Sequence, residues 1–284
     1  MQRILVTEKI SQEGLDNLRN SGYEVDEKLD LSPEKLMEEI AGAHAVIIRS
    51  ATTITDEIMS KGENLVVIGR AGIGLDNVDV ESATKRGIMV VNAPKSNILS
   101  AAEHTLALLL SQARNIPPAN AALKNGRWER SKWTGVELAD KTLGIIGLGR
   151  IGKLVAQRAL AFGMKLVAYD PYIAEERAQQ LSVELVSLEQ LMEVSDFVTI
   201  HVAKTPETIN LINAESLSNA KPTLRIVNVA RGGIINESDL ADAVSSGQIA
   251  GAALDVFEQE PTVESPLFDL SLIHISEPTR QPCI

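Results

Sequence analysis

The residues best placed for chemistry are three glycines, Gly147, Gly149 and Gly152, in the sequence Gly-Leu-Gly-Arg-Ile-Gly. An apolar run over 143–146 comes before them, and a helix-like segment over 153–162 follows. A strand, a tight turn and a helix in this order point backbone N–H groups and the positive end of a helix dipole at one place, which suits a pyrophosphate. The sequence therefore predicts a dinucleotide site at this turn.

An acidic residue refines this prediction. The next apolar run, 166–169, ends on Asp170, close to the offset of about 20 residues at which a carboxylate binds a ribose 2′-hydroxyl. A carboxylate at this point accepts hydrogen bonds from a ribose diol and repels the 2′-phosphate of NADP, so we predict NAD as the cofactor. The alternative is that the glycines serve only the turn and that Asp170 is a cap before Pro171.

Open α/β sheets bind ligands outside the carboxyl ends of their strands, and the predicted strands carry polar residues or glycines there. These are Arg49 and Ser50, the glycine turn over 69–74, Arg231 with Gly232 and Gly233, and Asp255, which Glu260 follows. The guanidinium of Arg231 is a planar fork of donors that suits a carboxylate. A surface salt bridge is the alternative. The backbone amides of the turn Gly72-Ile73-Gly74 form one candidate binding site for an anion. The alternative is a turn that binds no ligand.

The elements that must position these residues follow an alternating pattern. Apolar runs over 4–6, 45–48, 65–68 and 89–91 alternate with amphipathic stretches such as 13–20 and 34–40, the rhythm of a parallel sheet. After a long apolar segment over 101–113 and a mixed-charge loop over 124–132, the rhythm resumes with runs at 143–146, 166–169, 197–201, 225–229 and 251–256. We predict an α/β protein of two doubly wound parallel-sheet domains, the second a Rossmann NAD-binding domain. The boundaries are 1–97 for a substrate-binding domain, 98–270 for the NAD-binding domain and 271–284 for an anomalous tail.

Composition limits the class of protein. The 284 residues are 44% hydrophobic and carry a net charge of -11, with an isoelectric point near 5.0. This charge disfavours nucleic-acid binding through a broad basic face. No apolar run approaches the roughly 20 residues of a membrane span, and no signal peptide precedes the first strand, so we expect a cytoplasmic protein with no membrane partner. Cys283 is the only cysteine and lies in the tail, so we expect no disulfide and no metal site.

With these residues assembled, the chain resembles the D-isomer-specific 2-hydroxyacid dehydrogenases from about Met1 to Leu270. Six ordered blocks carry the resemblance: residues 49–53, 69–79, Asn92-Ala93-Pro94 with Ser96-Asn97, 147–152, Asn228-Val229-Ala230-Arg231-Gly232-Gly233, and Leu254-Asp255-Val256-Phe257. The second block, Gly-Arg-Ala-Gly-Ile-Gly-Leu-Asp-Asn-Val-Asp, is the longest.

The resemblance implies roles for individual residues. Arg231 would bind the substrate carboxylate and polarise its C2 oxygen, and Glu260 would hold a catalytic histidine and favour its protonated form. The residues implied to bind substrate are Arg49, which would face a phosphate, Ser50, Gly72, Ile73, Asn97 and Arg130. Those implied to bind NAD are Gly147, Gly149, Arg150, Ile151, Gly152, Asp170, Val202, Val229, Ala230 and Asp255, the last at the nicotinamide end.

Arg130 lies in a charged loop, 127–132, that looks like the dimer arm of the family. A basic residue of that arm reaches the substrate of the neighbouring subunit, and we assign this role to Arg130. The resemblance thus implies a homodimer or homotetramer. A solvated charged loop without a function is the alternative.

The chain departs from the family at the catalytic base. The family's histidine, in a Pro-His-Leu-Gly or similar motif, would fall at Pro278, and no such motif is present. None of the four histidines, His44, His104, His201 and His274, is proposed as the base. His201, at the end of a strand, comes nearest, and His104 is interpreted as a packed helix residue.

The end of the chain offers an explanation. Residues 270–280 resemble an in-frame translation of a transposase adapter used in shotgun sequencing. We hypothesise that the native sequence ends near Leu270, so that the catalytic histidine and the helices that return onto the first domain are missing. The chain would then be a truncated and inactive enzyme with exposed apolar surface on its first domain.

For the natural enzyme, the resemblance implies NAD-dependent oxidation of a small anionic 2-hydroxy acid, 3-phospho-D-glycerate, to 3-phosphohydroxypyruvate, the first step of L-serine biosynthesis. One alternative is a glyoxylate or hydroxypyruvate reductase, or another D-2-hydroxyacid dehydrogenase. An alternative of another class is an NAD-sensing, corepressor-like protein without turnover, against which the presence of both Arg231 and Glu260 speaks.

Overall fold

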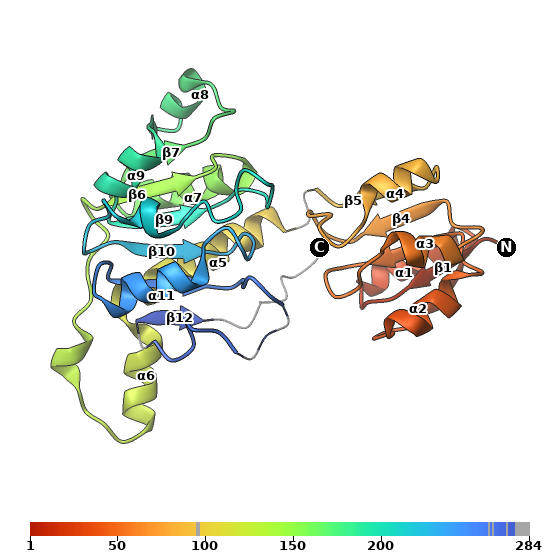
Figure 1. The fold of residues 1–284 in the computed structure, drawn as a ribbon, viewed down its shortest axis with the longest axis horizontal. Helices are drawn as coiled ribbons and strands as arrows, with labels where there is room; N and C mark the ends of the chain where they lie inside the picture. Colours follow the sequence, from red (N-terminus) through yellow and green to blue (C-terminus); the bar gives the residue numbers. More distant parts are fainter. Residues whose placement is uncertain (95–96, 261, 263, 271, 276–284) are drawn as a thin grey trace. The chain divides into compact units, whose positions relative to one another are not determined.

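The computed structural model describes residues 1–94, 97–260, 262, 264–270 and 272–275. Two compact units make up this part of the chain, Met1–Asn97 and a second unit that begins at Ile98 (Figure 1). In the part of the chain that is described, no helix combines the length and the apolarity needed to cross a bilayer.

The first unit is built on a five-stranded sheet in which every pair is parallel, in the order β2-β1-β3-β4-β5. Its strands are β1 (Arg3–Val6), β2 (Glu24–Glu27), β3 (Ala45–Ile48), β4 (Val67–Arg70) and β5 (Met89–Asn92), and its helices are α1 (Gln12–Asn20), α2 (Pro33–Ile40), α3 (Asp56–Lys61) and α4 (Val80–Lys85). A polar side chain caps the start of each helix by accepting a backbone N–H, from Ser11, Ser32, Thr55 and Asp79 respectively. These caps fix where each helix begins, because the first N–H groups of a helix have no partner within it.

The two faces of this sheet are covered unequally. Helices α2, α3 and α4 pack on one face, where residues such as Leu36, Ile58 and Ala83 join the strand residues in a large core. On the other face, the cluster of buried residues consists of Leu15 from α1 with Ile4 and Val6 from β1.

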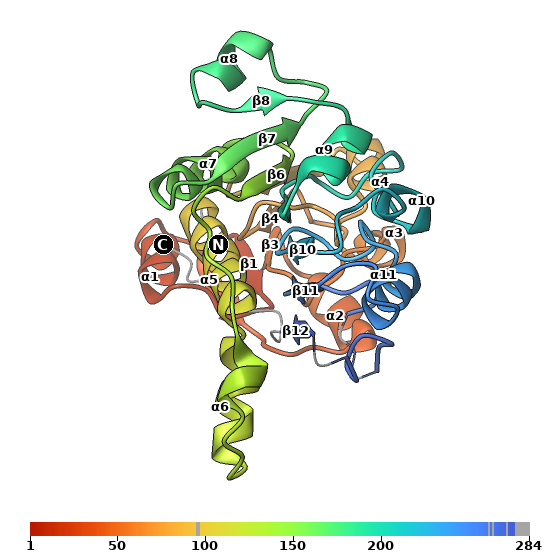
Figure 2. The same ribbon diagram turned by 90° about the vertical axis from the view of Figure 1, so that its left-hand side faces the viewer.

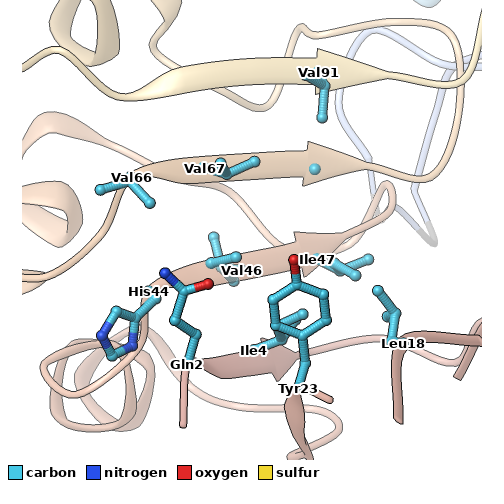
Figure 3. Close-up of a pocket in the computed structure, with 12 residues that line it drawn as sticks. Gln2, Ile4, Leu18, Tyr23, His44, Val46, Ile47, Val66, Val67 and Val91 are labelled. Carbon is cyan, nitrogen blue, oxygen red and sulfur yellow. The ribbon is translucent and has the colours of Figure 1, made fainter. Parts of the chain in front are cut away.

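Beside α1 the second face of the sheet is open. A pocket of about 280 Å³ lies there, lined mainly by apolar side chains (Figure 3): Gln2, Ile4, Leu18, Tyr23, His44, Ala45, Val46, Ile47, Val66, Val67, Gly69 and Val91. Parallel sheets are normally covered on both faces. We call the apolar surface formed by Ile47, Val66, Val67, Met89 and Val91 the open sheet face.

The second unit holds a seven-stranded parallel sheet in the order β12-β11-β10-β9-β6-β7-β8. Its strands are β6 (Thr142–Ile146), β7 (Lys165–Tyr169), β8 (Glu184–Leu185), β9 (Phe197–Ile200), β10 (Arg225–Asn228), β11 (Gly251–Leu254) and β12 (Ile273–Ile275). Counted from β6, the strands from β8 to β11 follow the order 3-2-1-4-5-6 of dinucleotide-binding folds. The predicted fold class, two doubly wound parallel sheets with a Rossmann domain second, is thereby confirmed.

The second unit also contains a set of helices, some of which cover the two faces of this sheet. They are α5 (Ile98–Arg114), α6 (Ile116–Lys124), a 3-10 turn η1 (Arg130–Trp133), α7 (Arg150–Ala161), α8 (Glu175–Gln179), α9 (Leu188–Val194), α10 (Ala214–Leu217) and α11 (Glu237–Ser245). One core contains residues of α5 and α7, and the other contains residues of α9, α10 and α11. Neighbouring strand residues point to opposite cores, as with Ile145 and Ile146. Such strands appear in the sequence as continuous apolar runs because both of their faces are buried.

Several predicted boundaries need correction. Strand β4 begins two residues later than the run 65–68, so Gly69 and Arg70 belong to the strand and pair with β3 and β5. Strands β2 and β8 were not predicted, because edge strands bury little and carry charged residues. Helix α6 was not predicted either, although prolines are tolerated in the first helical turn, where Pro117 and Pro118 stand.

Candidate functional site

The glycine turn between β6 and α7 has the geometry that its sequence predicted. Gly147 has a φ of +89°, and a Cβ there would lie 2.7 Å from His201 O. A Cβ on Gly152 would collide with Gly147 O, whereas one on Gly149 would meet no protein atom. Gly149 is the N-cap of α7 and makes no side-chain cap bond, so the start of this helix is open to an anion.

Asp170 follows β7 and contacts the same turn. Its Oδ2 accepts the Leu148 N–H at 2.8 Å, and its Oδ1 accepts the Tyr172 N–H at 2.9 Å. The side chain therefore caps the local backbone, as the alternative interpretation required. It also lines a pocket of about 340 Å³ with Leu148, Gly149, Lys153, Tyr172, Ile173, Ala174 and Arg177. The two roles are compatible, since each carboxylate oxygen accepts more than one hydrogen bond.

The residues after β9 complete the turn's surroundings. Val202 packs against Gly147, where an added Cβ would meet its Cγ1 at 2.7 Å. The Nε2 of His201 is buried and has no hydrogen-bond partner in the described residues. Burial lowers the pKa of His201 to about 3, so the ring is neutral at pH 7. A ring that stays neutral through this range is poorly suited to general base chemistry near neutral pH.

Arg231 lies in the loop after β10, which a buried asparagine braces. The Nδ2 of Asn228 donates to Arg231 O at 3.0 Å, and its Oδ1 accepts the Ala230 N–H at 3.0 Å. Arg231 Nη1 donates to Ala230 O at 2.7 Å. Val229 and Ala230 are half-buried in the same turn. The side chain of Asn228 thus fixes the backbone from which the guanidinium projects.

The loop after β11 packs directly against the Arg231 loop. A Cβ on Gly232 would collide with Phe257 O, so the two loops approach as closely as only glycine allows. Asp255 is buried, and its Oδ1 lies 3.0 Å from Nε2 of His104 on α5. Glu260 accepts the Phe257 N–H at 2.8 Å. The structure thus places five of the implied residues on two adjoining loops: Val229, Ala230, Arg231, Asp255 and Glu260.

His104 is more than a packed helix residue, because its imidazole contacts the carboxylate of Asp255. Sequence reasoning missed this pair, since the two residues are far apart in the chain. It also assigned no role to Asn228, for which the signal was available: an asparagine at the end of a buried strand, next to a turn with two glycines.

In the first unit, the implied substrate residues gather at the carboxyl ends of β3 and β4. Arg49 and Ser50 follow β3, and the turn with Gly72 and Ile73 follows β4. The Gly72 N–H donates to Arg70 O at 2.8 Å, so this amide is engaged within the turn. Asn97 ends the unit, and its Oδ1 is buried without a hydrogen-bond partner in the described residues.

The remaining implied residues belong to helix starts and to the arm. Arg150 and Ile151 open α7, where Arg150 is exposed and Ile151 packs partly on the core. Arg130 is an exposed residue of η1, in the segment after α6. Within the second unit, α6 projects from the body in both views (Figures 1 and 2).

The tail after Leu270 is described only in part. Pro278, where the family's histidine would fall, and Cys283 lie outside the described residues. Within the tail, β12 pairs in parallel with β11, with His274 opposite Ala253.

The strand order, the glycine turn and the pocket beside Asp170 define an α/β dinucleotide-binding protein. A family model described as "D-isomer specific 2-hydroxyacid dehydrogenase, NAD binding domain" matches residues 106–277. The chain belongs to the D-isomer specific 2-hydroxyacid dehydrogenase family and contains its NAD-binding domain. The predicted family and cofactor are thereby confirmed.

Named relatives support this assignment. The D-3-phosphoglycerate dehydrogenase of Synechocystis sp. is 50% identical over 271 residues, which are 95% of this chain and 49% of that protein. The enzyme of the same name from Archaeoglobus fulgidus is 45% identical over 284 residues, covering 98% of this chain and 54% of that protein. The chain thus spans about half the length of these relatives.

Solved structures show the same fold across the chain. A protein from Thermus thermophilus aligns with a TM-score of 0.90 at 36% identity, covering 98% of this chain and 89% of that one. The D-lactate dehydrogenase of Aquifex aeolicus, solved with NAD and lactic acid, aligns with a TM-score of 0.85 at 27% identity, covering 97% and 87%.

Proposed function

We propose that the natural protein oxidises 3-phospho-D-glycerate to 3-phosphohydroxypyruvate with NAD, the first step of L-serine biosynthesis. The observation that carries this proposal is the close packing of the Arg231 loop on the loop of Asp255 and Glu260, in a chain whose relatives at 45–50% identity bear the name D-3-phosphoglycerate dehydrogenase. The substrate is then a small anionic 2-hydroxy acid, and the cationic side chain at Arg231 suits its carboxylate.

The residues present fit NAD. The open side of Gly149 leaves room for a pyrophosphate at the start of α7, and Asp170 lines a pocket suited to a ribose. NAD, when bound, supplies the acceptor for the hydride that leaves C2.

The chain's own residues bind and orient the substrate in this proposal. Arg231 pairs with the carboxylate and polarises the C2 oxygen through donors held in a fixed plane. Glu260 orients a histidine that takes the hydroxyl proton, and its negative charge favours the protonated ring. Asp255, held by His104, contacts the nicotinamide end. Arg49 and Ser50 of the first unit are proposed to bind substrate as the family resemblance implies, with Arg49 for the phosphate.

We further propose that the sequence after Leu270 is not native and that the 284-residue chain lacks the catalytic histidine. If so, the 284-residue chain binds NAD but does not oxidise a hydroxyacid. Sequencing the source DNA beyond the codon for Leu270 tests this directly. A Pro-His-Leu-Gly-like segment is the expected result, and a native reading frame through 271–284 would contradict it.

The activity is tested on the protein encoded by the full gene. NADH formation is measured with 3-phospho-D-glycerate and, in parallel, with D-glycerate, D-lactate and glycolate. We expect the highest kcat/KM with the phosphorylated acid, and a loss of about 100-fold or more in Arg231→Lys because Lys cannot reproduce the bidentate contact. Preference for glyoxylate or hydroxypyruvate as an oxidant of NADH would identify a reductase instead. NAD binding without turnover of any of these acids would favour a sensor.

A further inference from the structure

One buried carboxylate of the first unit has no place in the proposed reaction. Glu8 follows β1 and is only 9% exposed. Its Oε1 accepts the N–H groups of Arg49 at 2.8 Å and Thr52 at 2.9 Å, and its Oε2 accepts that of Ala51 at 3.2 Å. A single side chain therefore engages three backbone donors of the loop 49–52.

A second side chain holds the acceptors of the same loop. The Nδ2 of Asn77 donates to Arg49 O at 2.7 Å and to Thr52 O at 2.5 Å. The hydroxyls of Thr7 and Thr52 lie 2.8 Å apart and add a third link. The loop is thus fixed from β1 on one side and from the turn after β4 on the other.

The charge on Glu8 is maintained by these contacts. Burial alone would raise the pKa of the carboxyl group, but the hydrogen bonds from Arg49, Thr52 and Ala51 outweigh it and lower the pKa below its ordinary value. Burying a carboxylate is costly unless its hydrogen bonds are made. An ionised group at this place is therefore stable only while the loop keeps its conformation.

We infer that Glu8 is a positioning residue, which sets the conformation of the loop that presents Arg49 and Ser50 to the substrate. This inference rests on the proposed function for the roles of Arg49 and Ser50. Because Glu8 occupies the amides of residues 49, 51 and 52, these amides are not available to an anionic substrate. Recognition at this loop then depends on the side chains and on the Ser50 N–H, which Glu8 does not engage.

The substitution Glu8→Gln tests this inference in the full-length protein. The carboxamide has the same shape, but its NH2 group faces a backbone donor instead of accepting from it. We expect KM for 3-phospho-D-glycerate to rise about tenfold, the effect of one lost charge-assisted hydrogen bond. The expected kcat and KM for NAD stay within about twofold, because the second unit is untouched. Glu38→Gln, which neutralises an exposed carboxylate of α2, is the matched control.

A second measurement does not depend on the substrate. Hydrogen exchange of the peptide containing residues 49–52 should be faster in Glu8→Gln than in the wild type and the Glu38→Gln control. Glu8→Asp, which keeps the charge, should restore part of the protection. An unchanged exchange rate would show that Glu8 does not fix the loop.

The two proposals fail in different ways. If the wild-type protein oxidises none of the tested acids, the proposed function is wrong, while the exchange data still decide whether Glu8 fixes the loop. If the wild type is active and Glu8→Gln exchanges faster without a rise in KM, the positioning role is overturned and Glu8 serves stability alone. Hydrogen exchange in Glu8→Gln that matches the wild type in the other peptides of residues 1–94 shows that a change in KM does not come from misfolding of the first unit.

Discussion

Gly147, Gly149 and Gly152 belong to one motif, but a different physical reason favours glycine at each position. The backbone of Gly147 and the packing of Gly152 exclude a side chain, whereas the Cα hydrogens of Gly149 face open space. A glycine at a position where the protein itself has room for a side chain suits a ligand that needs the space.

The comparison of Gly149→Ala with Gly152→Ala tests this distinction. We expect Gly149→Ala to lower the free energy of unfolding by no more than about 1 kcal/mol, since its φ of -72° suits alanine and only a weaker helix cap results. Its Kd for NAD should rise about tenfold or more, measured by calorimetry. Gly152→Ala should instead lower the free energy of unfolding by about 1–3 kcal/mol, because the turn must shift to admit the methyl group. Equal affinity for NAD in Gly149→Ala and the wild type would contradict the proposed position of the pyrophosphate.

His201 predicts a pH dependence of stability. Its pKa is about 3 in the folded protein against an ordinary 6.5, so between these values the unfolded chain binds the extra proton. The contribution of His201 to the free energy of unfolding is therefore fully present above about pH 6.5. It is lost as the pH decreases, by at most about 1.4 kcal/mol per pH unit. Urea unfolding of the wild type and His201→Gln between pH 7 and pH 5 measures this slope. The variant should lose less stability over that interval, and parallel curves would show that His201 is not responsible.

At the scale of elements, the strands buried on both faces could be predicted from sequence, because each one is an apolar run. The run 143–146 and β6 nearly coincide, and so do the run 45–48 and β3. The edge strand β2, with the sequence Glu-Val-Asp-Glu, gives no such signal. Its place is fixed by pairing with β1, a contact between distant residues.

The same limit applies to the candidate site. Glycines and an aspartate at a known spacing predicted the turn and its acidic neighbour, because both depend on local geometry. The contacts of Asp255 with His104, and of Glu8 with the loop 49–52, join residues far apart in sequence. Nothing in the local sequence of Glu8 or His104 distinguishes them from an exposed carboxylate or a core histidine.

The open sheet face leads to a prediction for β5. Met89 and Val91 point to this face and are 62% and 43% exposed, while Val90 packs into the opposite core. In the 284-residue chain, Met89→Lys combined with Val91→Thr should reduce binding of a hydrophobic dye and self-association, with unfolding changed by less than about 0.5 kcal/mol. Val90→Thr is the control on the same strand and should destabilise the unit, because it buries a hydroxyl group. Dye binding that the double variant leaves unchanged would place the exposed apolar surface elsewhere.

At the scale of the whole molecule, the net charge is negative, whereas the side chains proposed to bind the substrate are positively charged. The chain carries a net charge of -11, yet the groups proposed to meet an anionic substrate are Arg49, Arg231 and Arg130. An acidic protein gains nothing from its overall field in attracting an anion. Binding must therefore rest on these few cationic side chains and on the loops that hold them, which is why the positions of Glu8 and Asn228 matter.

Helix α6 and the charged loop 127–132 that follows it, together called the arm from here on, lead to a prediction about oligomerisation. Helix α6 buries only Ala122, and Leu123 and Trp128 are 59% and 81% exposed. An isolated helix of this length is marginal in water, so the arm needs further contacts to keep its structure. A second copy of the chain packed on the exposed side chains of Leu123 and Trp128 would supply such contacts, as the homodimer or homotetramer implied by the resemblance requires.

Sedimentation of the full-length protein measures this assembly. We expect a dimer or tetramer for the wild type and a shift towards the monomer in Leu123→Glu combined with Trp128→Glu, because charges are excluded from the centre of an interface. Ile209→Glu, which alters another exposed apolar residue of the second unit, should leave the assembly intact. If Arg130 acts on the substrate of the neighbouring subunit, the monomeric variant should also show a raised KM for 3-phospho-D-glycerate with its affinity for NAD unchanged. A double variant that remains fully assembled would separate the arm from oligomerisation and leave Arg130 as a solvated surface residue.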